Sequence, residues 1–174
     1  QDCISEAGAA ASRVATFLKD PEMEISLNKA FINPAVCIKC GTCSENCVYD
    51  AIDTTGDEYK VLEVSCQGCG KCAATCPTGA IDLRHYLDHQ IEAQMDGILA
   101  QDPDSIIAIV CTQCGYNAAD LAGTSRSYYS AKVKIVKYPC TARVASQHLV
   151  YPFLRGARGV MVVGCLPDQC HYID

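Results

Sequence analysis

CIKCGTCSENCVYDAID at residues 37–53 and CQGCGKCAATCPTGAID at residues 66–82 are two copies of one pattern. Aligned at an offset of 29, the copies match at eight of seventeen positions, four of which are cysteine. Each copy has the spacing C-x2-C-x2-C-x3-C, in which three cysteines lie close together and a fourth follows. Cysteines at these intervals are typical of iron–sulfur ligands. The repeat therefore predicts metal centres.

The repeat also predicts which cysteines act together. A loop that supplies three thiolates to a cubane needs a fourth from elsewhere, and in this motif the fourth cysteine binds the other cluster. We therefore predict two [4Fe-4S] clusters in an α+β module of the bacterial ferredoxin type. Cluster 1 takes Cys37, Cys40, Cys43 and Cys76, and cluster 2 takes Cys66, Cys69, Cys72 and Cys47. Structural zinc is the alternative, although zinc sites more often use paired C-x2-C units.

The residues around the repeat have recognisable patterns. A turn at residues 55–57 lies between short strand-like pieces at 51–54 and 59–64, which predicts a β-hairpin between the two cluster motifs. Residues 83–100 have apolar side chains at helical spacing, and the sequence Gln-Asp-Pro-Asp at 101–104 ends that pattern. We expect this helix to pack between two domains.

From residue 105 the pattern changes to strands that alternate with helices. Apolar runs at 106–110, 133–136 and 159–163 predict strands, and helical patterns follow the first two, at 118–122 and 142–154. Apolar strands alternating with helices predict a parallel sheet, here in a small α/β domain of Rossmann-like type.

Five further cysteines belong to this second half: Cys111, Cys114, Cys140, Cys165 and Cys170. Cys111, Cys140 and Cys165 each come at or shortly after the end of a predicted strand. The carboxyl ends of parallel strands face one crevice, so we expect these cysteines to lie close together. We predict that four of the five bind a [2Fe-2S] cluster. Three alternatives remain: an all-cysteine zinc site, a dithiol redox centre at Cys111 and Cys114, or cysteines that are merely buried.

The N-terminal segment reads as an alanine-rich helix over residues 2–18. We expect its apolar side chains to form a buried stripe, and Cys3 to be a small buried side chain. The members of the stripe are Ile4, Ala11, Val14, Phe17 and Leu18. Because the sequence starts at Gln1 and ends soon after a cysteine, we expect it to be part of a longer chain. The predicted divisions are residues 1–33, the end of a preceding domain; 34–101, the ferredoxin domain with its trailing helix; and 102–174, a truncated α/β domain.

Composition narrows the functional classes. The net charge of −6 argues against nucleic acid as a partner, and no apolar run is long enough to span a membrane. Fourteen cysteines in ligand spacings indicate metal binding in a reducing cytoplasm, as in an anaerobe, rather than a disulfide scaffold. Residues 121–167 contain seven Lys or Arg and no Asp or Glu. This stretch is either a solvated, charge-compensating face or, through Lys132, Lys134 and Lys137, a docking surface for an acidic partner.

The second half resembles the delta subunit of methyl-viologen-reducing hydrogenase, a [2Fe-2S] electron-transfer protein. The resemblance rests on CTQCGYNAADLAGTSR at 111–126, VKYPCTARV at 136–144 and GARGVMVVGCLPDQCHY at 156–172. DCISEAGAAASR at 2–13, together with the two cluster motifs, is similar to the C-terminal region of the A-type subunit of heterodisulfide reductase. The combination resembles forms of this A-type subunit, in methanogenic archaea and other anaerobes, that are fused to the delta-type domain.

This resemblance implies an iron–sulfur relay in flavin-based electron bifurcation or confurcation. It places FAD in a part of the protein outside this sequence, which has no G-x-G-x-x-G motif of its own. The implied partners are other heterodisulfide reductase subunits, a hydrogenase or formate dehydrogenase, and ferredoxin. The stretch itself is expected to carry electrons without catalytic residues. His171, beside a candidate ligand, is a candidate for outer hydrogen bonding to the second site.

Overall fold

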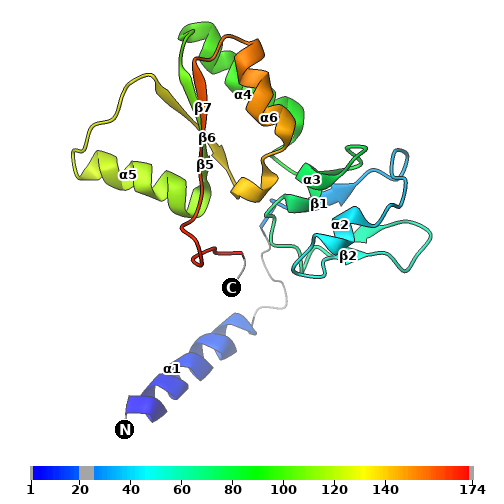
Figure 1. Cartoon of the computed structure of the whole chain (residues 1–174). Helices are drawn as coiled ribbons and strands as arrows, with labels where there is room; N and C mark the ends of the chain where they lie inside the picture. The colour runs from blue at the N-terminus through cyan, green and yellow to red at the C-terminus, as the bar shows by residue number, and fades with distance from the viewer. Residues whose placement is uncertain (1, 20–25, 173–174) are drawn as a thin grey trace.

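The computed structural model of this protein describes residues 2–19 and 26–172. A small ferredoxin-type module and an α/β layer lie side by side, and the N-terminal helix stands apart from both (Figure 1).

Two antiparallel strand pairs frame the ferredoxin module. β1 (Ala30–Ile32) pairs with β4 (Ile81–Leu83), and β2 (Ile52–Asp53) pairs with β3 (Lys60–Val61). The β2–β3 pair confirms the predicted hairpin in a shorter form. β1 was not predicted as a strand, because three residues have too little periodicity to stand out in a sequence.

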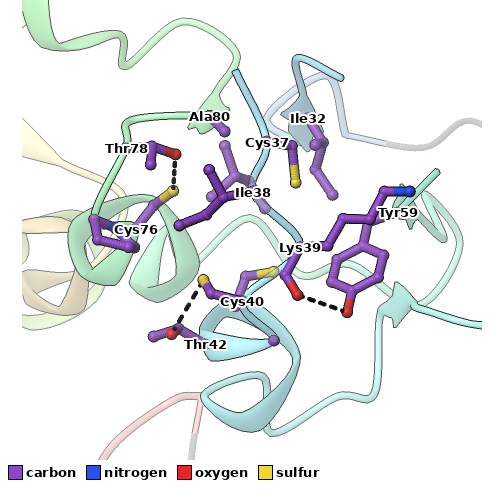
Figure 2. Close-up of a pocket in the computed structure, with 14 residues that line it drawn as sticks. Ile32, Cys37, Ile38, Lys39, Cys40, Thr42, Tyr59, Cys76, Thr78 and Ala80 are labelled. Carbon is purple, nitrogen blue, oxygen red and sulfur yellow. Dashed lines mark hydrogen bonds between the residues drawn. The ribbon is translucent and has the colours of Figure 1, made fainter. Parts of the chain in front are cut away.

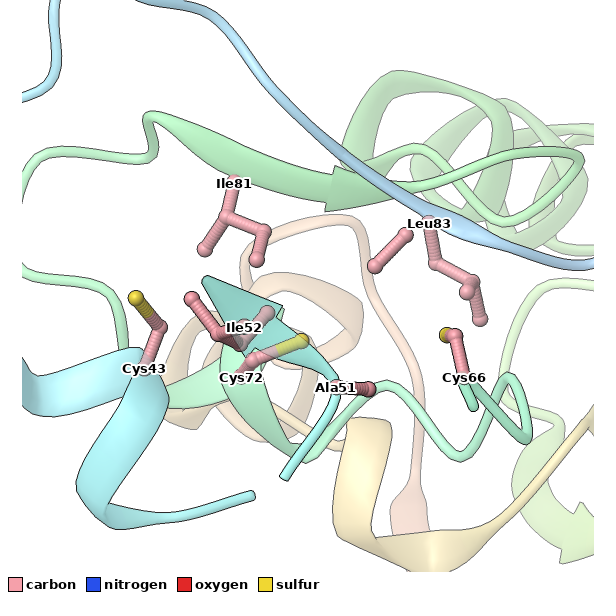
Figure 3. Close-up of a cluster of buried hydrophobic side chains, with 8 residues drawn as sticks. Cys43, Ala51, Ile52, Cys66, Cys72, Ile81 and Leu83 are labelled. Carbon is pink, nitrogen blue, oxygen red and sulfur yellow. The ribbon is translucent and has the colours of Figure 1, made fainter. Parts of the chain in front are cut away.

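One short helix lies in each copy of the repeat. α2 (Thr42–Glu45) follows Gly41 in the first copy, and α3 (Lys71–Thr75) follows Gly70 in the second. The core between the helices and strands includes three of the motif cysteines beside small and branched apolar side chains (Figure 3). Its buried members are Ala30, Cys43, Ala51, Ile52, Cys66, Cys72, Ile81 and Leu83. The centre of this module is therefore built partly from candidate ligands.

The second half contains the predicted parallel sheet. Its strands are β5 (Ile106–Cys111), β6 (Val133–Tyr138) and β7 (Gly159–Val163), in the order β6-β5-β7. β5 is the central strand and pairs in parallel with both neighbours. Burial on both faces explains why its sequence is continuously apolar. The Rossmann-like character of the domain stays a prediction.

Short and long helices connect these strands. A π-helical turn, η1 (Thr112–Tyr116), leads into α5 (Asn117–Thr124), and a 3-10 turn, η2 (Thr141–Arg143), precedes α6 (Ser146–Leu154). α4 and α6 pack against each other on one side of the sheet (Figure 1).

α4 (Asp88–Gln101) is the trailing helix predicted for residues 83–100. It begins later than predicted because residues 81–83 pair with β1 as a strand. Its buried residues Ile91, Met95 and Leu99 join the core of the α/β layer, where they meet side chains of β5 and β6. The helix therefore belongs to the sheet layer by its packing, and the division of the chain near residue 101 stays a prediction.

The N-terminal helix α1 (Asp2–Phe17) was correctly expected as a helix, but its predicted buried stripe is wrong. Ile4, Val14 and Leu18 are 80%, 55% and 72% exposed, and Ala11 is also exposed. Cys3 is exposed as well, against the prediction that it is buried. An apolar face is buried only where another element covers it, and α1 stands away from the rest of the described chain (Figure 1). The side chain of Phe17 lies outside the described part.

No helix in residues 2–19 or 26–172 combines the length and the apolar character needed to cross a bilayer.

Candidate metal centres

The four cysteines predicted for cluster 1 line one pocket (Figure 2). They come from both copies of the repeat and are Cys37, Cys40, Cys43 and Cys76. The pocket is walled mainly by apolar groups, among them Ile32, Ile38 and Tyr59. Four thiols around a largely apolar hollow suit a cubane, which needs four thiolates and little water.

Hydroxyl and amide groups stabilise negative charge on two of these sulfurs. The Thr42 Oγ1 lies 3.4 Å from the Cys40 Sγ, and this interaction holds the pKa of Cys40 below its usual value. At Cys76 burial alone would raise the pKa, but hydrogen bonds from the backbone of Ile81 and Thr78 outweigh it and lower the pKa. These contacts favour the thiolate form that binds iron.

The four cysteines predicted for cluster 2 line a second pocket. They are Cys47, Cys66, Cys69 and Cys72. Burial raises the pKa of Cys69, and it raises the pKa of Cys72 to about 12. Without a metal these buried thiols would be neutral at pH 7, so iron must displace their protons when it binds.

The cluster 2 loop is held closely by other parts of the chain. Gly68 has a φ of 69°, and a Cβ added there would lie 2.1 Å from the Asn28 carbonyl oxygen. Gly70 has a φ of 80°, and a Cβ there would lie 2.6 Å from Cδ of Arg143. Both positions need glycine for conformation and for space. The loop is thus packed against the segment before β1 on one side and against η2 on the other.

Three of the five cysteines of the second half form a compact group. The Sγ atoms of Cys111, Cys114 and Cys165 all lie within 4.8 Å of one another. Cys111, at the end of β5, accepts hydrogen bonds from the backbone N–H groups of Cys114 (3.3 Å) and Gly115 (3.2 Å). Burial raises the pKa of Cys165 to about 12. The predicted convergence at this edge of the sheet therefore holds for three cysteines.

Cys140 and Cys170 lie outside that compact group. Cys140 is buried at the end of β6, and its Sγ accepts a hydrogen bond from the Ala142 N–H at 3.4 Å. Burial raises the pKa of Cys140, and the nearby Cys69, Cys170 and Cys111 raise it further. Arg143, three residues after Cys140, packs on Gly70, the residue after Cys69, so the turn that carries Cys140 lies against the cluster 2 loop.

The CHY motif at residues 170–172 connects the two centres. His171 Nδ1 lies 3.8 Å from the Cys114 Sγ, as expected for a histidine outside the ligand set. The Tyr49 hydroxyl, in the wall of the cluster 2 pocket, donates a 2.6 Å hydrogen bond to the Tyr172 carbonyl. Neither tyrosine was expected at a site, because nothing in the local sequence marks a contact across 123 residues.

A buried arginine joins the two halves of the chain. Arg143 donates from Nη2 to Asp82 Oδ1 at 2.8 Å, to Asp88 Oδ1 at 2.6 Å and to the Tyr86 carbonyl at 3.0 Å. His148 accepts the Ala145 N–H at Nδ1, which leaves Nε2 as the donor to Asp88 at 3.1 Å. The hydrogen bonds from His148 and Arg143 hold the pKa of Asp88 well below its usual value.

Most other cations of the basic stretch also have acidic partners. Lys132 and Lys134 both pair with Asp102, and Arg155 pairs with Asp96 of α4. Lys137 lies over the ring of Tyr116, with 4.3 Å from its Nζ to the centroid. Two of the three lysines proposed for the docking surface, Lys132 and Lys134, are thus paired within the chain. This favours the charge-compensating alternative.

The repeat forms a module with four cysteines in each of two pockets, and three further cysteines cluster at one edge of the parallel sheet. These features define the class of protein: an iron–sulfur protein of the ferredoxin type. Comparison with known proteins agrees. The family model "4Fe-4S dicluster domain" matches residues 30–83, and the model "Methyl-viologen-reducing hydrogenase, delta subunit" matches residues 106–174. Residues 30–83 are therefore similar to a 4Fe-4S dicluster domain, which supports iron–sulfur clusters as cofactors, and residues 106–174 are similar to the hydrogenase delta subunit.

Relatives of two kinds cover the chain. One is the A-type subunit of the ferredoxin:CoB-CoM heterodisulfide reductase of Methanosarcina mazei, which is 38% identical over 99% of this chain. Another is the A-type subunit of the ferredoxin/F420H2-dependent CoB-CoM heterodisulfide reductase of Methanosarcina acetivorans, which is 39% identical over 99% of this chain. The D-type iron–sulfur subunit of an F420-non-reducing hydrogenase from Methanocaldococcus jannaschii is 51% identical over 38% of this chain and 50% of its own length. These similarities confirm the resemblance drawn from the sequence. The chain spans 22% of the length of the two heterodisulfide reductase relatives.

Proposed function

We propose that this chain is an iron–sulfur electron relay within a heterodisulfide reductase-type complex. One observation carries the proposal: each pocket of the ferredoxin module is lined by three cysteines of one repeat copy and the fourth cysteine of the other. That exchange is what two [4Fe-4S] clusters in this motif require. The clusters would take up and release single electrons, and the protein groups around them would set how readily they do so.

A third centre is assigned to the rim of the sheet. Cys111, Cys114 and Cys165 supply three ligands, and the fourth is Cys140 or Cys170. The resemblance of this half to the hydrogenase delta subunit implies that the cluster at this site is a [2Fe-2S] cluster. His171 would serve as an outer partner of the Cys114 sulfur.

The contacts between the halves favour one order of centres. Tyr49 in the wall of the cluster 2 pocket donates to the Tyr172 carbonyl, and Arg143 of η2 packs on Gly70 of the cluster 2 loop. Cluster 2 would therefore be the ferredoxin centre next to the sheet rim. Cluster 1 would be the outer centre, since its ligand Cys40 is exposed. Electrons would pass between the rim centre and cluster 2, and between cluster 2 and cluster 1.

The wider setting follows from the relatives. Two of them are named as parts of CoB-CoM heterodisulfide reductases that use ferredoxin, and one as part of a hydrogenase. These names support work with other heterodisulfide reductase subunits, ferredoxin and a hydrogenase. A formate dehydrogenase as an alternative donor, and FAD bound outside residues 1–174, come from the resemblance drawn from the sequence. We place the complex in the cytoplasm of an anaerobe.

The dithiol alternative is less well supported. A disulfide reductase needs an accessible attacking thiolate, and the Cys111 side chain is 1% exposed. Zinc remains chemically suited to three clustered thiols and a fourth. Metal content separates zinc from the relay.

The test is anaerobic purification followed by metal and sulfide analysis. The relay predicts iron and acid-labile sulfide in equal amounts, with little zinc and with absorbance that bleaches on reduction. Zinc without acid-labile sulfide would overturn the proposal. Thiol–disulfide turnover that is lost on Cys111→Ser would favour the dithiol function instead.

A further inference from the structure

Among the described residues, two Lys or Arg side chains are buried. Both contact the cluster 2 loop, residues 66–72, from other parts of the chain. Lys29 is 6% exposed and Arg143 is 1% exposed. Lys29 bonds to the carbonyl of Cys66, and the stem of Arg143 packs on Gly70. Lys39, in the cluster 1 loop, is exposed. The two loops therefore differ in the positive charge buried beside them.

Backbone contacts hold Lys29 in place. Its N–H donates to the Leu27 carbonyl at 2.8 Å, and its carbonyl accepts from the Arg84 N–H at 3.0 Å. The preceding carbonyl, of Asn28, fills the space that a side chain at Gly68 would occupy. With the main chain fixed in this way, Lys29 Nζ donates to the Cys66 carbonyl at 2.5 Å. The ammonium is thereby held at the first ligand of the loop.

The charges of the two buried cations are balanced differently. Arg143 pairs with two carboxylates, Asp82 and Asp88. Within residues 2–19 and 26–172, Lys29 has no carboxylate at ion-pair distance; its Nζ bonds to the carbonyl of Cys66. A buried ammonium without a counter-charge is unfavourable. An anionic cluster held by Cys66 and its neighbours would supply that counter-charge.

We propose that Lys29 is the counter-charge of cluster 2 and holds the reduction potential of that cluster above the value it would have without this cation. The inference rests on the proposed function, because it needs a cluster at these cysteines. Reduction adds one electron to the cluster and breaks no bond. A nearby buried cation therefore stabilises the reduced state more than the oxidised state. Lys29 is thus a positioning and charge-compensating residue that acts on cluster 2 and leaves cluster 1 largely unaffected.

The test is a potentiometric titration with paramagnetic resonance on the full chain and four variants. Lys29→Met removes the charge and the hydrogen bond, Lys29→Gln removes the charge but keeps a donor for the Cys66 carbonyl, and Lys29→Arg keeps the charge. Lys60→Met removes the same charge from an exposed site on β3 and is the matched control. A Cys40→Ser background, which alters a ligand of cluster 1, identifies which signal belongs to which cluster.

We expect Lys29→Met and Lys29→Gln to lower the cluster 2 potential, so that the reduced-to-oxidised ratio at a fixed applied potential falls roughly tenfold, or ~59 mV for a one-electron couple. Lys29→Arg should restore most of the shift, and Lys60→Met should leave both clusters unchanged. Unchanged potentials in Lys29→Gln, or equal shifts of both clusters, would overturn the inference. Absence of cluster signals in the wild-type chain would instead overturn the proposed function, so the two failures are distinguishable.

Discussion

Arg143 donates a 2.8 Å hydrogen bond to Asp82, and this bond ties the turn after β6 to the residue at the centre of β4. The arginine side chain is 1% exposed and that of Asp82 is 22% exposed, so water screens the pair weakly. Arg143 lies three residues after Cys140, and its stem packs on Gly70, the residue after Cys69. The contact therefore fixes the sheet rim against the cluster 2 loop.

Removing this arginine should loosen the two halves of the chain. We expect Arg143→Met to lower the stability measured by anaerobic urea titration by about 3 kcal/mol, because it leaves two carboxylates without their buried partner. Arg155→Met, which removes a half-exposed arginine paired with Asp96, is the control and should cost much less, because water screens that pair. Equal effects of the two variants would contradict a special role for Arg143.

Gly70 is expected to tolerate no side chain. Gly70→Ala should cost about 2–4 kcal/mol, from the left-handed backbone and from the collision with Arg143. Gly79→Ala is the matched control, since Gly79 has a φ of 64° but nothing within 4 Å of an added Cβ; it should cost about 1–2 kcal/mol. Urea titration of both variants measures the difference. If the two costs are equal, the packing of Arg143 on Gly70 does not constrain the loop.

The contribution of Asp88 should be constant around neutral pH. Its pKa in the folded chain lies below the unfolded value of about 3.9, so its stabilising effect is fully present above pH ~4 and is lost as the pH falls further. Asp88→Asn should therefore cost about 1–3 kcal/mol at every pH from 5 to 8. We expect no larger loss of stability, because the Asp88 side chain is 43% exposed and water screens its charge. A cost that changes between pH 5 and 8 would contradict a carboxylate that is already ionised throughout this range.

Single serine variants should sort the five cysteines of the second half. Replacing Cys111, Cys114 or Cys165 should each abolish the signal of the third centre, because their sulfurs lie within 4.8 Å of one another. Of Cys140→Ser and Cys170→Ser, one should abolish the signal and the other should leave it in place. Paramagnetic resonance of the reduced variants is the measurement. A signal that survives loss of any of the first three cysteines would contradict the assigned group.

Much of the fold was predictable because its signals are local. The repeat predicts the cysteine grouping, and strict alternation of apolar runs with helical patterns predicts the parallel sheet. β1 was missed because it has three residues and is stabilised by pairing with β4, about fifty residues away. The exposed face of α1 was missed because spacing can indicate an amphipathic helix but cannot indicate what covers it.

The contacts between the two halves were beyond sequence reasoning. Arg143, Asp82 and Asp88 are ordinary charged residues in the sequence, and their joint burial depends on how the two halves meet. The same holds for Lys29, whose side chain bonds to the carbonyl of Cys66, 37 residues away in the sequence. The ligands could therefore be predicted from spacing, whereas the groups that surround them required the three-dimensional arrangement.

The central claim is that the chain holds two cross-ligated [4Fe-4S] clusters and a third iron–sulfur centre in electronic contact. Anaerobic redox-titrated paramagnetic resonance of the full chain tests it most directly. We expect two interacting cubane signals and a separate [2Fe-2S] signal, with only one cubane relaxing faster when the third centre is reduced. Zinc in place of iron, a single cubane, or three centres that relax independently would contradict the claim.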